Sequence, residues 1–113
     1  MINRHSDSGY HSLLDGIVIK TLVHGQKTLM AEFRMARGSA LPRHQHPYEQ
    51  TGYLVSGKLR LTIGETDAIM EAGDSWCIQQ DVPHKADVME NSVVLELFSP
   101  PRADYLQYSE LTA

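Results

Sequence analysis

The sequence predicts an all-β protein, a sandwich or barrel of short strands. Apolar and β-branched segments of strand length recur at even spacing, turn residues separate them, and no long amphipathic helix pattern intervenes. The 113 residues fit one domain, 1–113, because they contain neither an internal repeat nor a linker that would divide them. With 42% hydrophobic and 21% charged residues, the composition is that of a globular protein rather than a disordered one.

Charge and hydropathy exclude two classes of partner. The formal net charge is −4 and the Lys and Arg residues are scattered, whereas nucleic-acid binding needs a clustered basic surface. No apolar run approaches the ~18 residues of a membrane span. The polar N-terminal lead, 1–15, lacks the apolar centre of a signal peptide, so the cytoplasm is the expected compartment. The single cysteine, Cys77, lies in an apolar stretch and is expected to be a small buried residue.

The first third of the chain predicts two strands joined by a hairpin. Residues 16–23, GIVIKTLV, are rich in β-branched residues and end at a turn for which Gly25 is suited. Residues 28–37 are ambiguous because Met, Ala, Glu and Arg favour a helix. Their apolar side chains nevertheless alternate with a period of two, and turn residues follow closely, so we predict a strand.

The remainder predicts further strands and turns. We expect a hairpin at Gly57, between 51–57 and 58–64, a turn at Gly73-Asp74 within 66–79, and two strands around Glu90-Asn91 within 84–99. Pro100 and Pro101 are expected to stop the sheet. The tail at 102–113 fits either a short helix or an extended segment.

A pair of histidines near the middle of the chain predicts a metal site. In a strand, residues two apart point to the same face, so His44 and His46 project together, and Pro47 favours extended backbone at His46. A third histidine, His84, lies downstream, and Gln50 offers an oxygen. Three imidazoles and one oxygen suit a divalent transition metal (Fe, Mn, Ni, Cu, Co or Zn) rather than Mg or Ca. Glu49 is the rival ligand, but adjacent strand residues point oppositely.

The spacing of these residues resembles that of the cupin family. Motif one of that family matches 38–57 and motif two matches 73–88; the matching positions are Gly38, His44, His46, Gln50 in place of the usual glutamate, Gly57, Gly73 and His84. Motif two is degraded, since the positions of its proline, second glycine and asparagine hold Gln79, Asp81 and Val88.

The resemblance implies a cupin jelly-roll β-barrel of two packed antiparallel sheets. It also implies that the four ligands converge in the barrel mouth around one divalent metal, and that the protein is a homodimer. A neutral amide in place of a carboxylate would leave the metal more cationic, which weakens metal affinity and strengthens attraction for an anionic or carbonyl substrate.

A carboxylate within an apolar segment is the second candidate feature. Glu96 alternates with apolar residues in 93–102, and it either faces water from an edge strand or lies in a pocket. The pattern Glu96, Phe98, Arg102 resembles the small cupins of pectin and alginate breakdown, which convert 4,5-unsaturated uronates to open-chain keto sugars, although those have Asp where this chain has Glu.

That narrower resemblance implies a role for each residue. Glu96 would move a proton as general acid or base, Arg102 would bind a substrate carboxylate or pair with Glu96, and Phe98 would pack on the sugar ring. Tyr53 and Trp76 are further candidates for lining the substrate pocket. We therefore predict an isomerase or hydratase acting on a small carboxylated sugar. A metal-dependent dioxygenase and a non-enzymatic small-ligand sensor are the alternatives.

Overall fold

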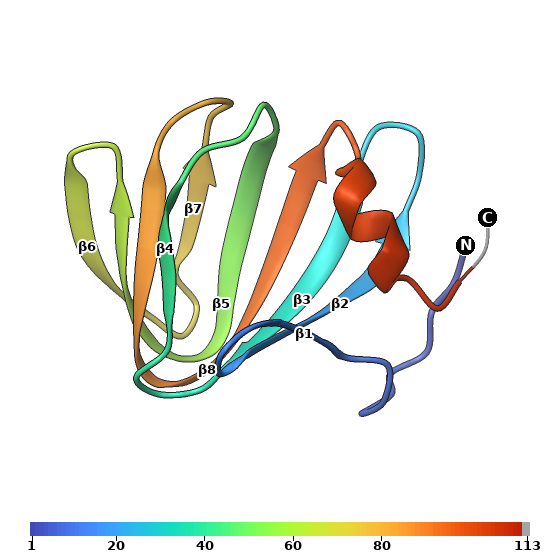
Figure 1. Cartoon of the computed structure of the whole chain (residues 1–113), viewed down its shortest axis with the longest axis horizontal. Helices are drawn as coiled ribbons and strands as arrows, with labels where there is room; N and C mark the ends of the chain where they lie inside the picture. Colours follow the sequence, from blue (N-terminus) through green and yellow to red (C-terminus); the bar gives the residue numbers. More distant parts are fainter. Residues whose placement is uncertain (112–113) are drawn as a thin grey trace.

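The computed structural model of the chain describes residues 1–111 (Figure 1). Over these residues it contains eight strands and one 3₁₀-helix: β1 (His11–Leu14), β2 (Ile17–His24), β3 (Leu29–Met35), β4 (Ala40–His44), β5 (Glu49–Ile63), β6 (Thr66–Glu71), β7 (Ser75–Ile78), β8 (His84–Ser99) and η1 (Ala103–Tyr108). All strand pairs are antiparallel. The predicted all-β fold is confirmed.

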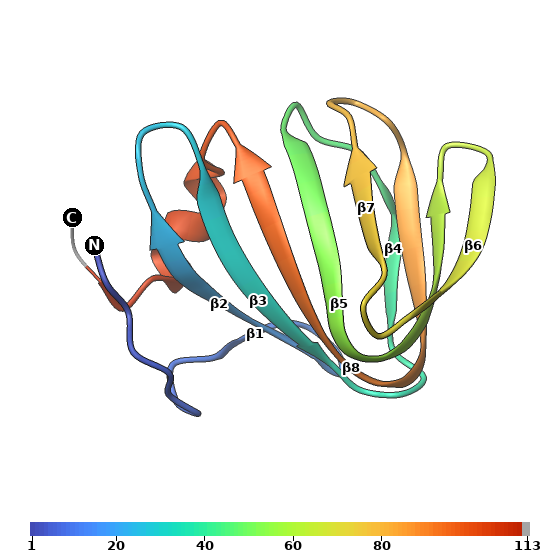
Figure 2. The ribbon, with the colours of Figure 1, turned by 180° about the vertical axis from the view of Figure 1, so that it is seen from behind.

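The strands form one continuous hydrogen-bonded network that folds into two layers (Figures 1 and 2). The first layer has the order β1, β2, β3, the second half of β8, the first half of β5, and β7. The second layer has the order β4, the first half of β8, the second half of β5, and β6. Both β5 and β8 therefore belong to both layers, and both curve at the bottom of Figure 1.

The bends in β5 and β8 correct two predictions: Glu49–Ile63 is one long strand rather than a hairpin at Gly57, and His84–Ser99 is one long strand rather than two strands around Glu90-Asn91. The register between β5 and β8 shifts repeatedly between Leu54 and Leu59, where the two strands turn from one layer into the other. Gly57 has a φ of +99°, and a Cβ there would lie 2.2 Å from Ser92 Oγ and 2.4 Å from the Asn91 carbonyl. Glycine is required at this crossing for its conformation and for its lack of a side chain.

The other predicted elements are confirmed with small shifts of boundary. Strands β2 and β3 form the expected hairpin, closed by a hydrogen bond from the Gly25 N–H to the Thr28 carbonyl at 2.9 Å. In β3 the alternating set Leu29, Ala31, Phe33 and Met35 is buried, as a strand and not a helix requires. The turn at Gly73-Asp74 joins β6 to β7.

Strand β8 ends at Ser99, before the two prolines, and the tail then forms η1. Residues 112–113 of the predicted tail lie outside the described residues. The polar lead runs along the outside of β2, and its last residues form β1. Within residues 1–111, no helix is both long and apolar enough to span a membrane.

The hydrophobic core lies between the two layers. Its buried members come from β2, β3, β5, β8 and η1, and include Ile17, Ile19, Leu29, Phe33, Leu54, Leu59, Val94, Phe98 and Tyr105. Cys77 is exposed, so its expected burial is wrong. It alternates with Ile78, whose side chain takes the inward position on β7.

Candidate metal and substrate site

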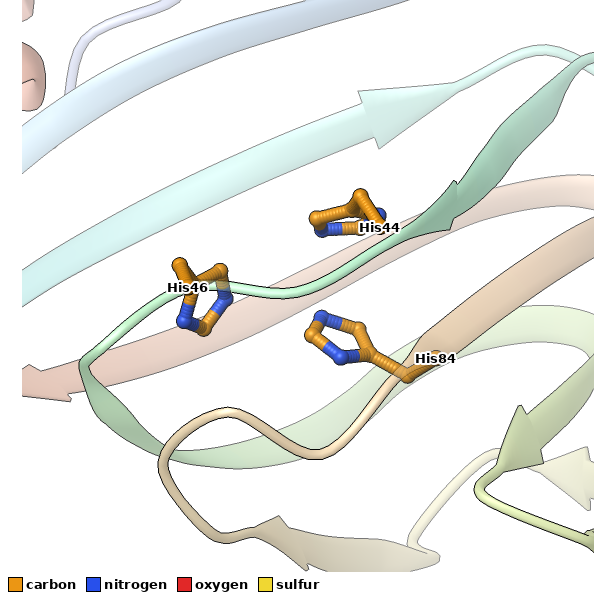
Figure 3. A group of neighbouring side chains, drawn as sticks. All are labelled: His44, His46 and His84. Atoms are coloured by element: carbon orange, nitrogen blue, oxygen red, sulfur yellow. The ribbon is translucent and has the colours of Figure 1, made fainter.

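Three histidines meet at the end of the barrel opposite the bends (Figure 3). His44 ends β4, His84 begins β8, and the two are direct partners in the β4–β8 ladder. His46 follows in the loop that leads to β5. One ring nitrogen from each histidine lies within 4.8 Å of the others. The predicted convergence of His44, His46 and His84 is therefore present in the fold.

Backbone hydrogen bonds fix the orientation of all three imidazoles. The Nδ1 atoms of His44, His46 and His84 lie 2.8, 3.1 and 2.8 Å from the carbonyl oxygens of residues 42, 48 and 82. A carbonyl can only accept, so each Nδ1 carries the proton in a neutral ring. Each Nε2 then presents a lone pair, which is the tautomer that metal ligation through Nε2 requires.

Of the two candidates for a fourth ligand, Gln50 and not Glu49 lies beside the histidines. Gln50 is 6% exposed on the inner face of β5, whereas Glu49 is exposed. The Gln50 Oε1 atom lies 2.7 Å from His46 Nε2. With Nδ1 protonated, both facing atoms are lone-pair acceptors, and a cation bound by both satisfies them together.

Electrostatics favour neutral imidazoles at this end of the barrel. The pKa of His84 is lowered to about 4, mainly by burial and also by the nearby imidazoles and Arg102, against the raising effect of the hydrogen bond to the Val82 carbonyl. Burial also lowers the pKa of His46, with Arg102 as the next largest cause. Within residues 1–111, His84 Nε2 is buried without a hydrogen-bond partner. Neutral rings, one orphaned Nε2 and an amide oxygen fit a divalent transition metal.

Glu96 lies in the interior, so the alternative of a water-facing edge strand is wrong. It is 7% exposed, on a strand that has β3 on one side and β5 on the other. The indole N–H of Trp76 donates to Glu96 Oε1 at 3.1 Å, and Oε2 is among the buried atoms without a partner in the part of the chain that the structure describes. Burial raises the pKa of Glu96 to about 8, against the opposing effect of the Gln50 and Trp76 side chains.

Arg102 lines the same pocket but pairs with Asp104 rather than with Glu96. Its Nε and Nη2 atoms donate to the two Asp104 carboxylate oxygens, each at 3.0 Å. Its guanidinium carbon lies 3.9 Å from the ring centre of Tyr105 and 5.1 Å from that of Phe98. Nη1 is buried and has no partner among residues 1–111. One edge of the guanidinium is thus fixed, and Nη1 remains free to bind an anion.

The pocket gathers most of the predicted residues. Its polar and aromatic lining includes His44, Gln50, His84, Glu96, Arg102, Trp76, Phe98 and Tyr105. The Phe98 ring lies edge-on to His46, with ring centres 5.8 Å apart. Tyr53 is the exception: it is 46% exposed on the outer face of β5, so its predicted place in the pocket is wrong. Since Gln50 points inward, Tyr53, three residues on, must point outward.

Sequence reasoning missed three residues of the site: Gly52, Asp104 and Tyr105. Gly52 shares the inward phase of Gln50, so the alternation along β5 could have placed it. Asp104 and Tyr105 depend on the turn of η1 behind the two prolines, and that turn has no strong signal in the sequence.

Comparison with known proteins identifies the family. A family model described as "Cupin domain" matches residues 31–99. The pectin degradation protein KdgF of Dickeya dadantii (strain 3937) is 26% identical over 102 residues, which are 88% of this chain and 93% of that protein.

Two solved structures resemble the whole fold. KdgF from Halomonas sp. has a TM-score of 0.88 and 25% identity, over 92% of this chain and 96% of that one. A RmlC-like cupin from Shewanella frigidimarina NCIMB 400 has a TM-score of 0.83 and 20% identity, over 93% and 99% of the two chains. With a family model that spans more than half of its length, this chain belongs to the cupin family.

Proposed function

We propose that the chain is a metal-dependent isomerase that converts 4,5-unsaturated uronates to open-chain keto sugars. The observation that carries this proposal is a set of buried polar atoms that face one pocket and have no partner among residues 1–111: His84 Nε2, Glu96 Oε2 and Arg102 Nη1. They offer a metal ligand, a proton-transfer group and a carboxylate-binding group. The similarity to a pectin degradation protein supports the choice of substrate class.

His44, His46, His84 and Gln50 are the residues that would hold the metal. A bound divalent ion would act as a Lewis acid that polarises a substrate oxygen. The neutral tautomers and the Gln50 amide leave the full charge of such an ion uncompensated by its protein ligands, and this favours an anionic substrate.

Arg102 is suited to bind the carboxylate of the uronate. Because Asp104 occupies Nε and one N–H of Nη2, the substrate carboxylate would approach Nη1 at the free end of the guanidinium. The rings of Tyr105 and Phe98 hold the guanidinium in place from the sides. Phe98 also offers its ring to the apolar face of the sugar.

Glu96 is the group that would move the proton. Ketonisation removes the proton of the anomeric hydroxyl, breaks the bond between C1 and the ring oxygen, and adds a proton to C4, so the reaction is an isomerisation without a redox partner. A single carboxyl that starts protonated can give its proton to C4 and then take the proton of the anomeric hydroxyl. With a pKa of about 8, the buried carboxyl of the metal-free site is mainly protonated at pH 7 and can serve as the acid.

The test is ultraviolet spectroscopy of purified protein with a 4,5-unsaturated uronate. The conjugated double bond absorbs in the ultraviolet, and its absorbance should fade faster with the metal-loaded protein than with chelator-treated protein. Glu96→Gln should lose most of this acceleration while retaining metal. Fading at the uncatalysed rate would rule the proposal out, and oxygen consumption with bound iron would favour a dioxygenase instead.

A further inference from the structure

A row of three residues crosses the inner face of the first layer beside the proposed site. In the β7–β5 ladder Trp76 is opposite Gly52, and in the β5–β8 ladder Gly52 is opposite Glu96. Figures 1 and 2 show β7, β5 and the second half of β8 side by side. Neighbouring strands lie about 4.8 Å apart, so the backbones of Trp76 and Glu96 are separated by roughly 10 Å. The indole N–H nevertheless reaches Glu96 Oε1, at 3.1 Å.

Because Gly52 has no side chain, the Trp76 indole can reach Glu96 across strand β5. A Cβ at this position would lie 2.1 Å from Trp76 Nε1 and 2.6 Å from Glu96 Oε2. Its φ is not in the left-handed region, so the backbone alone does not require glycine here. The space above Gly52 is instead filled by the indole and the carboxyl group. Any larger residue would force the two apart.

The row also distinguishes the two oxygens of Glu96. Oε1 accepts the indole N–H, whereas Oε2 is buried without a partner in the part of the chain that the structure describes. On the opposite side, the register partner of Glu96 is Ala31, which offers no polar side chain. The contact with Trp76 therefore holds the carboxyl group by one of its two oxygens.

We propose that Trp76 is the positioning residue of Glu96 and that it acts across the gap left by Gly52. The proposal rests on the proposed function for the role of Glu96. It gives Trp76 a task other than the substrate contact that the sequence predicted.

The hydrogen bond from Trp76 matters because the Glu96 side chain is flexible. Glu96 has a longer side chain than the aspartate of the resembling cupins, and therefore one more rotatable bond. A misplacement of about 1 Å at a reacting group can cost about 100-fold in rate. The indole N–H and the packing above Gly52 restrict the carboxyl group to one position.

The kinetic test uses Trp76→Phe and Gly52→Ala in the metal-loaded protein with a 4,5-unsaturated uronate. Each should lower kcat by about 10- to 100-fold and leave KM within about twofold, because carboxylate binding and metal loading do not involve the row. Gly25→Ala is the matched glycine control, since no atom of residues 1–111 lies within 4 Å of its Cβ position. Ile19→Ala is the packing control, since Ile19 is fully buried in the core on β2 and is not among the residues that line the pocket. Both controls should retain kcat.

A second measurement reports on the contact without any activity. The chain has one tryptophan, so the metal-free protein gives a single indole N–H resonance in NMR spectra. Glu96→Ala should move this resonance and speed its exchange with solvent, and Gly52→Ala should do the same. An indole signal and exchange rate that Glu96→Ala leaves unchanged would overturn the proposal.

The outcomes separate this inference from the function on which it rests. If wild-type protein does not ketonise the uronate, the proposed function fails, and the catalytic role of the row fails with it. If wild-type protein is active and Trp76→Phe keeps its kcat, only the positioning role is overturned. A loss of kcat in Trp76→Phe equalled by Ile19→Ala would assign the effect to core packing, and would also overturn it.

Discussion

Within residues 1–111, buried polar groups are hydrogen-bonded at one end of the β5–β8 pair of strands and lack partners at the other. At the bent end, the buried Ser92 hydroxyl accepts the N–H of Lys58 at 3.1 Å and donates to the carbonyl of Glu90 at 2.8 Å, and the neighbouring, exposed Asn91 side chain accepts the N–H of Arg37. At the open end, His84 Nε2, Glu96 Oε2 and Arg102 Nη1 are buried and unpaired among residues 1–111.

The two ends of β5 and β8 therefore have different roles: the bent end stabilises the fold, and the open end offers polar groups to a ligand. Buried polar groups without partners cost about 1–3 kcal/mol each, so a fold retains them where a ligand supplies the missing partner. The bent end has paired polar groups and close backbone contact, which stabilise the turn between layers. Changes at the bent end should therefore affect folding, and changes at the open end should affect ligands.

The largest expected effect is at the open end, from His84→Ala. Removing one of four ligands should lower metal affinity by about 100-fold or more, since even residues that only support a ligand cost about 10- to 100-fold. Elemental analysis and competition with a chelator measure this. His5→Ala, on an exposed residue of the lead, should retain about one metal ion per chain. Full metal retention by His84→Ala would contradict the assignment of the site.

The next largest effect is at the bent end, from Gly57→Ala. The new Cβ would meet Ser92 and the Asn91 carbonyl, and the φ of +99° disfavours alanine, so the free energy of unfolding should fall by about 3 kcal/mol or more. Gly38→Ala has a similar φ of +85° without a nearby atom and should cost only about 1–2 kcal/mol. Urea unfolding distinguishes them. Equal losses would mean that backbone conformation, and not the crossing of the strands, decides.

Glu96→Gln tests how much ionisation of the buried Glu96 carboxyl group lowers the free energy of unfolding of the metal-free protein. The pKa of Glu96 is raised from 4.5 to about 8, so between these values the unfolded chain binds fewer protons than the folded one. Wild-type stability should therefore fall as the pH rises from about 4.5 to 8.

The variant lacks this titration. Its stability advantage should grow from near zero at pH 4.5 to roughly 3 kcal/mol at pH 8, since one pKa unit corresponds to about 1.4 kcal/mol and relaxation of the site reduces the full value. His46 and His84, whose lowered pKa values reduce stability as the pH falls below about 6.5, are present in both proteins and cancel. Urea unfolding with a chelator at several pH values measures the difference, and Glu49→Gln is the exposed control. A difference that does not vary with pH would contradict the prediction.

The smallest effect expected is from Arg102→Ala. Loss of the free Nη1 donor should raise KM for a carboxylate-bearing uronate by about 10- to 100-fold, because hydrogen bonds to charged groups contribute about 1.5–3 kcal/mol. Arg60→Ala, at an exposed arginine in the second half of β5, should leave KM unchanged. Unchanged kinetics in Arg102→Ala would remove this residue from the site.

Much of the open end could be predicted because it follows from local spacing. The period of two places His44 with His46 and separates Gln50 from Glu49, and family spacing adds His84. The same period, applied consistently along β5, would have turned Tyr53 outward and Gly52 inward.

The bent end could not be predicted, because a glycine with positive φ has the same sequence signal in a hairpin turn as in a bulge. Gly57 and Asn91 mark bends within long strands only because β5 and β8 cross there, which is a long-range contact. Asp104 and Tyr105, the partners of Arg102, could not be predicted for a related reason. Their positions depend on how the tail turns after the sheet has ended.

One strand, β8, begins with the proposed metal ligand His84 and carries Glu96 near its other end. The bend between them folds this single strand back on itself, so the chain between the two residues fixes the spacing of ligand and acid. Inserting or deleting one residue there would reverse the inward and outward faces of half the strand. A change in the length of β8 would therefore separate ligand from acid, whereas a change in the length of the segment after Ser99 would move Arg102 alone.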